Sequence, residues 1–198
     1  MVGAKLSFIQ HNVNRQPEAQ QAILQQAVES QTDIVFLQEP AVASNPLRNG
    51  TWICYQHPSY YPILPEPGLS LSDIPQRPRV LTYVRRLLGL QVNARFDLAL
   101  DPDFQAIEVA ASEPFIAVNI YNQKAKPPAI GPYTLDRLFQ RQELLQKLRQ
   151  RPSLLVGDFN LHHTWWNATA QPSSRANKLV TWLVEIKASF FFFFITHI

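Results

Sequence analysis

Four short apolar runs, each ending in a polar side chain, constrain the fold of this chain more than any other feature. Leu6 to Asn12 and Asp33 to Glu39 are the first two, and Pro114 to Tyr121 and Leu154 to Asn160 are the others. Short apolar runs bounded by polar residues predict strands that are buried on both faces. If these strands share one sheet direction, or sit at one edge of a two-sheet sandwich, their polar tips converge on one site.

The last of these runs ends in Gly-Asp-Phe-Asn and carries the most chemistry. Asp158 supplies a carboxylate and Asn160 an amide, and two residues separated by one position can point the same way. Such a pair suits an attacking water and a charged phosphate. The alternative interpretation is a strand followed by an Asx turn, and the heptapeptide alone does not decide between the two.

The segments between some of these runs have helical periodicity and are predicted to be helices. Pro17 to Ser30 has apolar residues at helical spacing among glutamines, so the chain begins with strand, helix and strand, which predicts a parallel unit. Residues 134–150 predict one long helix, and 176–186 predict another. The apolar stripe of the long helix consists of Leu135, Leu138, Phe139, Leu145 and Leu148.

The middle of the chain is expected to be rich in loops, because 16 prolines stand against 6 glycines. Between Ala41 and Gln76 we expect no helix and only short strands, at 51–55 and 61–64. Two longer strands are predicted at 79–85 and 104–111.

Composition bounds the class of protein. With 198 residues the chain is long enough for one domain with its own core. A net charge of +3 only weakly favours polyanionic partners. The single cysteine, Cys54, fits a reducing compartment, no signal peptide is recognisable, and no apolar run is long enough to span a bilayer. We therefore expect an intracellular protein without a membrane segment, whose oligomeric state the sequence leaves open.

The order of the polar tips resembles the endonuclease/exonuclease/phosphatase superfamily. Residues 33–40 and 158–163 look most like the endonuclease domains of non-LTR retrotransposons, and the resemblance spans about residues 6–183. It implies an α/β fold, the DNase I-like four-layer α/β sandwich, here incomplete at the C-terminus because the second sheet lacks its final strands. The motifs that carry the resemblance are Asn12, Gln38-Glu39, Ile120-Tyr121-Asn122 and Gly157-Asp158-Phe159-Asn160.

The resemblance also implies a role for each tip. Glu39, helped by Asn12, would hold Mg²⁺, for which Mn²⁺ could substitute, and Asp158 would orient or deprotonate the attacking water. Asn160 would fix that aspartate or contact the phosphate, and Tyr121 would stabilise the transition state by a hydrogen bond. The implied reaction is hydrolysis of a phosphodiester that nicks DNA, and the resemblance alone implies a nuclear location.

The C-terminal part departs from the family pattern. The closing Ser-Asp-His of the family is absent, no aspartate follows Asn160, and the only later histidines are His162, His163 and His197. We therefore expect a truncated domain over 1–187, an aberrant Phe-rich tail over 188–198 such as a frameshift would produce, and weak or absent catalysis. A genuine short family member whose tail packs in place of the lost strands is the alternative.

Two other functions remain open from the sequence. One is a non-catalytic remnant that at most binds nucleic acid, and the other is a phosphatase built on the same fold. His162 and His163 are not interpreted as metal ligands, because adjacent side chains diverge and the sequence shows no third ligand.

Overall fold

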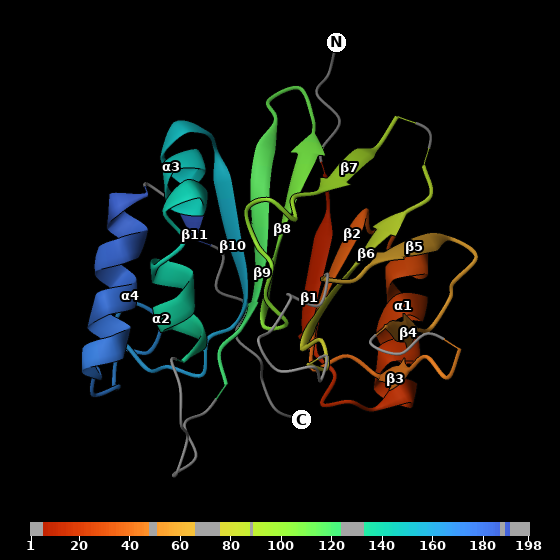
Figure 1. Cartoon of the computed structure of the whole chain (residues 1–198), viewed down its shortest axis with the longest axis horizontal. Helices are drawn as coiled ribbons and strands as arrows, with labels where there is room; N and C mark the ends of the chain where they lie inside the picture. The colour runs from red at the N-terminus through yellow and green to blue at the C-terminus, as the bar shows by residue number, and fades with distance from the viewer. Residues whose placement is uncertain are drawn as a thin grey trace.

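Two β-sheets lie face to face at the centre of the molecule, with helices on both outer faces (Figure 1). The structure is a computed structural model. It describes residues 6–47, 51–65, 76–87, 89–123, 133–186 and 189–190.

The first sheet is built by the N-terminal part of the chain. Its strands pair in the order β1 (Phe8–Asn12), β2 (Ile34–Gln38), β6 (Val80–Arg85) and β5 (Tyr60–Ile63). Strands β1 and β2 are parallel and are connected through helix α1 (Pro17–Glu29), which confirms the predicted strand, helix and strand unit. The other pairs of this sheet are antiparallel.

The second sheet is built by the C-terminal part. Its order is β11 (Ser189–Phe190), β10 (Ser153–Asp158), β9 (Phe115–Tyr121), β8 (Phe104–Ala110) and β7 (Gln91–Ala94). β10 is parallel to both of its neighbours, whereas β8 is antiparallel to β9 and β7.

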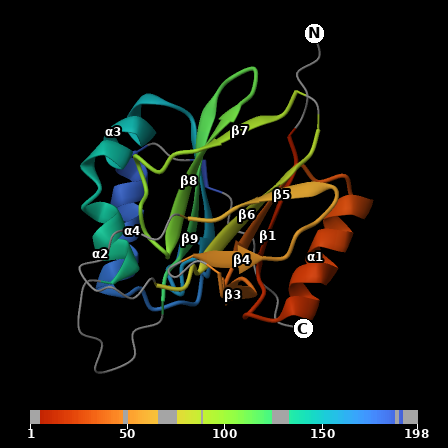
Figure 2. The same ribbon diagram turned by 45° about the vertical axis from the view of Figure 1, so that its right-hand side comes forward.

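A separate hairpin joins β3 (Val42–Ser44) to β4 (Trp52–Cys54). It lies beside the N-terminal end of α1 (Figure 2).

Three apolar cores separate four layers. Leu24 and Ala27 of α1 pack on Val35 and Leu37 of the first sheet. Side chains from the facing sides of the two sheets form the middle core. Helices α2 (Thr134–Phe139), α3 (Gln142–Gln150) and α4 (Ser174–Glu185) cover the second sheet through the third core. The predicted α/β sandwich of four layers is therefore confirmed.

Two local predictions are wrong. The single helix expected over 134–150 is broken at Gln140 and Arg141, where the backbone of Arg141 leaves the helical region. The break allows Leu144 to be buried together with Leu145 and Leu148, which one straight helix would not place on a single narrow face. Strands β3 and β7 were not predicted, because each is short and only partly buried.

The C-terminal end of the chain is described only in part. Ser189 and Phe190 form β11, which pairs with β10, and the rest of the tail predicted over 188–198 lies outside the described residues. The predicted domain limits and the predicted loss of final strands remain predictions. Among the described residues, no helix is long and apolar enough to cross a membrane.

Candidate active site at the polar end of the two sheets

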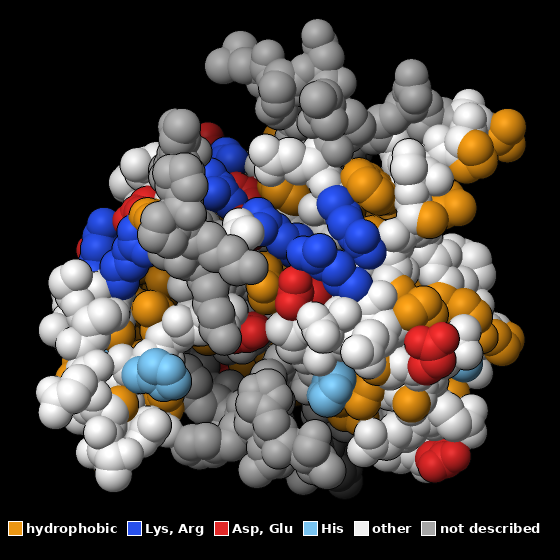
Figure 3. Space-filling view, turned by 90° about the horizontal axis from the view of Figure 1, so that it is seen from below, with side chains coloured by type: hydrophobic (Ala, Val, Ile, Leu, Met, Phe, Trp, Pro, Cys, Tyr) orange, Lys and Arg blue, Asp and Glu red, His pale blue; other side chains and the backbone are white. Residues whose placement is uncertain are grey.

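The layer between the sheets changes from apolar to polar along the strands. Side chains alternate between the two faces of a strand, so Asn12 shares the face of Phe8, and Asp158 shares the face of Val156. Tyr121 likewise shares the face of Ala117. Because β9 is parallel to β10, Tyr121 and Asp158 lie at the same end of the second sheet, and the hydrogen bond between Asn12 and Asp158 places Asn12 at that end of the layer too. Figure 3, which views the molecule from below, shows acidic side chains next to a group of lysine and arginine side chains.

One hydrogen bond joins the two sheets at this end. The Nδ2 of Asn12 donates to the Oδ2 of Asp158 over 2.9 Å, although 146 residues separate them in the chain. The Oδ1 of Asn12 accepts the backbone N–H of Asn14 over 2.9 Å. Both ends of the amide are therefore used, which fixes its orientation beside the carboxylate.

Glu39 is held at the site by an unusual backbone. Its φ is +46°, and Asn14 and Arg15 also have positive φ, which costs about 1–3 kcal/mol at each non-glycine residue. The N–H of Glu39 donates to the carbonyl of Arg79 over 2.8 Å, and its carbonyl accepts the N–H of Arg15 over 2.7 Å. The side chain is 14% exposed and pairs with the Arg15 guanidinium over 3.2 Å. Strain of this kind clusters at functional sites.

Tyr121 interacts with both carboxylates, those of Glu39 and Asp158. Its pKa is raised to about 12, first by burial and then by the charge of Glu39, a hydrogen bond to the Glu39 carboxylate and the charge of Asp158, while the charge of Arg79 acts in the opposite direction. The guanidinium of Arg79 lies 5.8 Å from the centre of the tyrosine ring. The phenol is therefore neutral at physiological pH and remains a hydrogen-bond donor.

The loop after β10 is held by the residue after β9. The N–H of Asn122 donates to the carbonyl of Asp158 over 2.8 Å, and its Nδ2 donates to the carbonyl of Phe159 over 2.6 Å. In return, the Nδ2 of Asn160 donates to the carbonyl of Asn122 over 2.7 Å. The backbone N–H of Asn160 donates to the Oδ1 of Asp158 over 3.0 Å, so an Asx turn does follow the strand. It is this backbone N–H of Asn160, and not its side chain, that bonds Asp158.

The close approach of β10 to β9 requires glycine at position 157. Its φ is +150°, and a Cβ at this position would lie 1.9 Å from the carbonyl oxygen of Ile120. A side chain would therefore separate the two strands immediately before Asp158.

A buried charge network lies behind Tyr121, and sequence reasoning did not find it. Asp103 is fully buried and accepts from Arg79, Arg137 and the Thr134 hydroxyl. Its carbonyl also accepts the N–H of Tyr121 over 2.8 Å. The sequence marks these residues only as the flanks of strands and helices, and nothing in their spacing shows that they meet.

The five predicted site residues thus lie together, and the two adjacent histidines do not join them. His163 is buried, accepts the N–H of Trp165 over 3.1 Å and packs on the ring of Trp166, while His162 is exposed. Within the described part of the chain, no group of three or more His, Cys, Asp and Glu side chains could hold a metal ion. Of the residues that the structure describes, Glu39 and Asp158 supply the acidic ligands at the site.

The sequence model of the endonuclease/exonuclease/phosphatase family matches residues 9–189, which is most of the chain. The chain belongs to this family. No curated protein matches the sequence.

Among the solved structures that are similar to this member of the family are the following. The endonuclease domain of TRAS1, a telomere-specific non-LTR retrotransposon, is 18% identical with a TM-score of 0.65, and the match covers 92% of this chain and 71% of that domain. The catalytic domain of APE2 from Xenopus laevis is 15% identical with a TM-score of 0.49, and covers 91% of this chain and 67% of its own. The match to the TRAS1 domain supports the DNase I-like fold.

Proposed function

We propose that this chain is a Mg²⁺-dependent phosphodiester hydrolase that nicks DNA, of the kind found in retrotransposon endonuclease domains. The observation that carries the proposal is the meeting of Asn12, Glu39, Tyr121 and Asp158 at one end of the two sheets, in a chain of this family. The retrotransposon context is supported by the similarity to the TRAS1 domain, which itself comes from a non-LTR retrotransposon.

The donor set of the site fits a hard divalent ion. Glu39 offers a carboxylate, and the Oδ1 of Asn12 keeps one lone pair after its bond to Asn14. Mg²⁺ prefers oxygen ligands, keeps several waters and needs only one or two carboxylates from the protein, and Mn²⁺ accepts the same ligands. When bound there, the ion would act as a Lewis acid on the scissile phosphate.

Asp158 is arranged to act on water. Each carboxylate oxygen accepts one hydrogen bond, from Asn12 and from the N–H of Asn160, and each keeps a lone pair. These bonds fix the plane of the carboxylate, so that a water held by the free lone pairs is oriented towards the phosphorus. Asp158 takes the proton of that water as the new P–O bond forms. Asn160 acts by holding the loop, through its bond to Asn122.

Tyr121 is arranged to donate a hydrogen bond to the phosphate. A phenol whose pKa is about 12 keeps its proton, and its hydroxyl can move from Glu39 to a phosphoryl oxygen as negative charge develops there. The guanidinium of Arg79 next to its ring adds positive charge on the same side.

We further propose that turnover is slow. Among the residues that the structure describes, no histidine hydrogen bonds with Glu39, Tyr121 or Asp158, so the phosphate would be stabilised by Tyr121 and by arginine charge without an imidazole. Removal of one group that acts in the transition state commonly costs about 10²–10³ in rate.

A nicking assay on supercoiled plasmid tests the proposal. Incubation with excess protein and Mg²⁺ should convert the plasmid to open circles, and EDTA or Asp158→Asn should stop the conversion. Asp97→Asn is the matched control, because Asp97 is 58% exposed and pairs with Arg95 and not with the site. Retention of plasmid without cleavage would instead indicate a binding remnant. Release of phosphate from monoesters, with plasmid intact, would indicate a phosphatase.

A further inference from the structure

A pocket lies next to the candidate active site. It has a volume of about 350 Å³ and is bounded by the first turns of α1, the β3–β4 hairpin and the segment before β6. Arg15, which pairs with Glu39, forms part of its wall, so the pocket and the site share one side chain. The pocket therefore borders the candidate site at Arg15.

Two arginines and no carboxylate of the described residues line the pocket, and Glu39, outside the lining, pairs with one of them, Arg15. Arg15 and Arg77 both line it, and the pKa of Arg77 is lowered first by burial and then by the charge of Arg15, while Glu39 raises it. Arg77 donates one bond, from Nη2 to the carbonyl of Pro40 over 3.4 Å. Its Nε is buried and has no hydrogen-bond partner in the described part of the chain. A buried charged donor without an acceptor calls for an anionic ligand.

The lining also includes an exposed aromatic and an exposed aliphatic side chain, both at or next to β4. Tyr55 is 42% exposed and Ile53 is 47% exposed, and both line the pocket. Flat aromatic side chains next to arginines are the usual platform for a nucleic-acid base.

Hydrogen bonds within the protein hold the residues around this pocket in place without a ligand. Buried Gln20 donates from Nε2 to the hydroxyl of Tyr83 over 3.1 Å and accepts the N–H of Ala41 over 2.9 Å. The Tyr83 hydroxyl in turn donates to the carbonyl of Tyr55 over 2.6 Å. These bonds connect α1, β6 and both ends of the hairpin, so a ligand would find the pocket already ordered.

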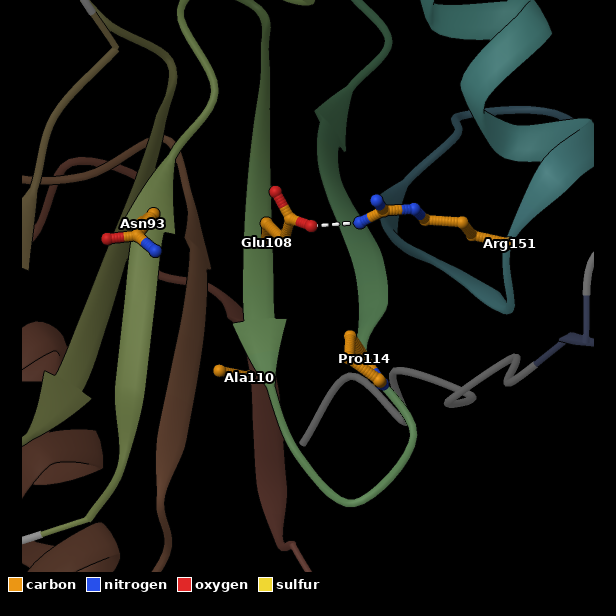
Figure 4. Close-up of a pocket in the computed structure, with 5 residues that line it drawn as sticks. All are labelled: Asn93, Glu108, Ala110, Pro114 and Arg151. Carbon is orange, nitrogen blue, oxygen red and sulfur yellow. Dashed lines mark hydrogen bonds and ion pairs between the residues drawn. The ribbon is translucent and has the colours of Figure 1, made fainter.

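A larger pocket at the other end of the second sheet lacks these features. It has a volume of about 580 Å³ and is lined by Asn93, Glu108, Ala110, Pro114 and Arg151 (Figure 4). There Glu108 pairs with Arg151, so the two charges that line the pocket neutralise each other. Arg151 therefore provides a matched control for Arg77.

We propose that the pocket beside Glu39 binds one nucleotide of the DNA strand next to the scissile phosphate. Arg15 and Arg77 bind the phosphate of that nucleotide, and its base rests on Tyr55 and Ile53. The proposal rests on the proposed function, because it needs a DNA strand that passes Glu39.

Binding without cleavage tests the proposal directly. The full chain is titrated into a fluorescein-labelled 12-nucleotide DNA in EDTA at several salt concentrations. Arg77→Gln should weaken binding about 10-fold and reduce the salt slope by roughly 0.7–0.9, as expected for the loss of one phosphate contact. Arg151→Gln should change binding less than twofold. Circular dichroism checks that both variants are folded.

Variants of the aromatic wall test the base contact. Tyr55→Ala should weaken binding about 5- to 10-fold, and Tyr55→Phe should bind as the native chain does, because stacking needs only the ring. Deoxyadenosine monophosphate should compete with the labelled DNA more strongly than inorganic phosphate does. Equal competition would show a site for phosphate alone and would overturn the base contact.

The outcomes separate this proposal from the proposed function. DNA binding that depends on Arg77 and Tyr55, without nicking by the native chain in Mg²⁺, would sustain the pocket and refute the nuclease. Nicking by the native chain with Arg77→Gln binding as tightly as the native chain would refute the pocket and sustain the nuclease. Equal losses of DNA affinity in Arg77→Gln and Arg151→Gln would show that only the overall charge matters, and would refute binding in the pocket.

Discussion

The two ends of the layer between the sheets are built by the same strands and differ in chemistry. At one end Phe8 and Phe36 meet edge to face, with ring centres 6.3 Å apart, among aliphatic side chains. At the other end Asn12, Tyr121 and Asp158 emerge from the same faces of the same strands. The comparison teaches that a few residues of strand length separate the part that stabilises the sandwich from the part that positions reactive groups.

A belt of buried amides divides the two ends. Gln38 donates to the Oδ1 of Asn119 over 2.6 Å and accepts a bond from Gln10. The Nδ2 of Asn119 donates to the carbonyls of Leu37 and Leu81, each over 3.2 Å. The bonds of Asn119 join the two sheets, so we expect them to affect the position of Glu39, the residue after Gln38.

The largest loss of stability should come from a side chain that separates β10 from β9 at position 157. Gly157→Ala places a Cβ against the carbonyl of Ile120 and should destabilise the protein by more than about 4 kcal/mol. Gly89→Ala is the matched control: Gly89 also has positive φ, +93°, but nothing lies within 4 Å of the added carbon, so about 1 kcal/mol is expected. Urea unfolding of both variants measures the difference. Equal stability of the two would show that the strands tolerate separation.

The apolar end should control stability and leave the chemistry unchanged. Phe36 is fully buried, so Phe36→Ala should cost about 3–5 kcal/mol. At a temperature where the variant is still folded, its single-turnover nicking rate should stay within about threefold of the native rate, a change below 1 kcal/mol in barrier height. A rate loss as large as that of Asp158→Asn would remove the distinction between the ends.

A change in the amide belt should affect the nicking rate more, and stability less, than a change at the apolar end. Asn119→Ala leaves the carbonyls of Leu37 and Leu81 and the amide of Gln38 without their partner, which should cost about 1–3 kcal/mol of stability. It should lower the nicking rate more than Phe36→Ala does, because Glu39 directly follows Gln38. A smaller rate effect than that of Phe36→Ala would place the belt outside the site.

The smallest effect concerns the pH dependence of stability. A tyrosine whose pKa is 10 in the unfolded chain and about 12 in the folded protein stabilises the fold fully below pH 10, and this stabilisation is lost as the pH rises from 10 to 12. The native chain should therefore lose more stability than Tyr121→Phe over this interval. Thermal unfolding at pH 9, 10 and 11 measures it. Parallel curves would show that the phenol titrates normally.

The sequence predicted the tips of the strands and did not predict what supports them. Asn12, Glu39 and Asp158 each end an apolar run, which is a local pattern that can be read without a partner. The hydrogen-bond partners of Asp103 and Asn119 could not be predicted, because the local sequence around a buried polar residue does not show which distant strand or helix supplies its partner. The bond from the Asn160 side chain to Asn122 was not predicted for the same reason.

The limits of helices were likewise predicted where a local pattern sets them and missed where distant packing does. Periodicity located α1 and α4 well, because each is one amphipathic face on one sheet. It failed at Gln140 and Arg141, where the shape of the second sheet, and not the local sequence, decides which leucines are buried.

The central claim is that Glu39 serves one divalent-ion site at the polar end, and titration of Mn²⁺ monitored by electron paramagnetic resonance tests it most directly. The native chain should bind one ion, and Glu39→Gln should bind it at least about 10-fold more weakly, since one carboxylate ligand is lost. Glu185→Gln, at a carboxylate that is 46% exposed and pairs with Arg149 on the helical side, should bind as the native chain does. Equal affinity of Glu39→Gln and the native chain would contradict the account.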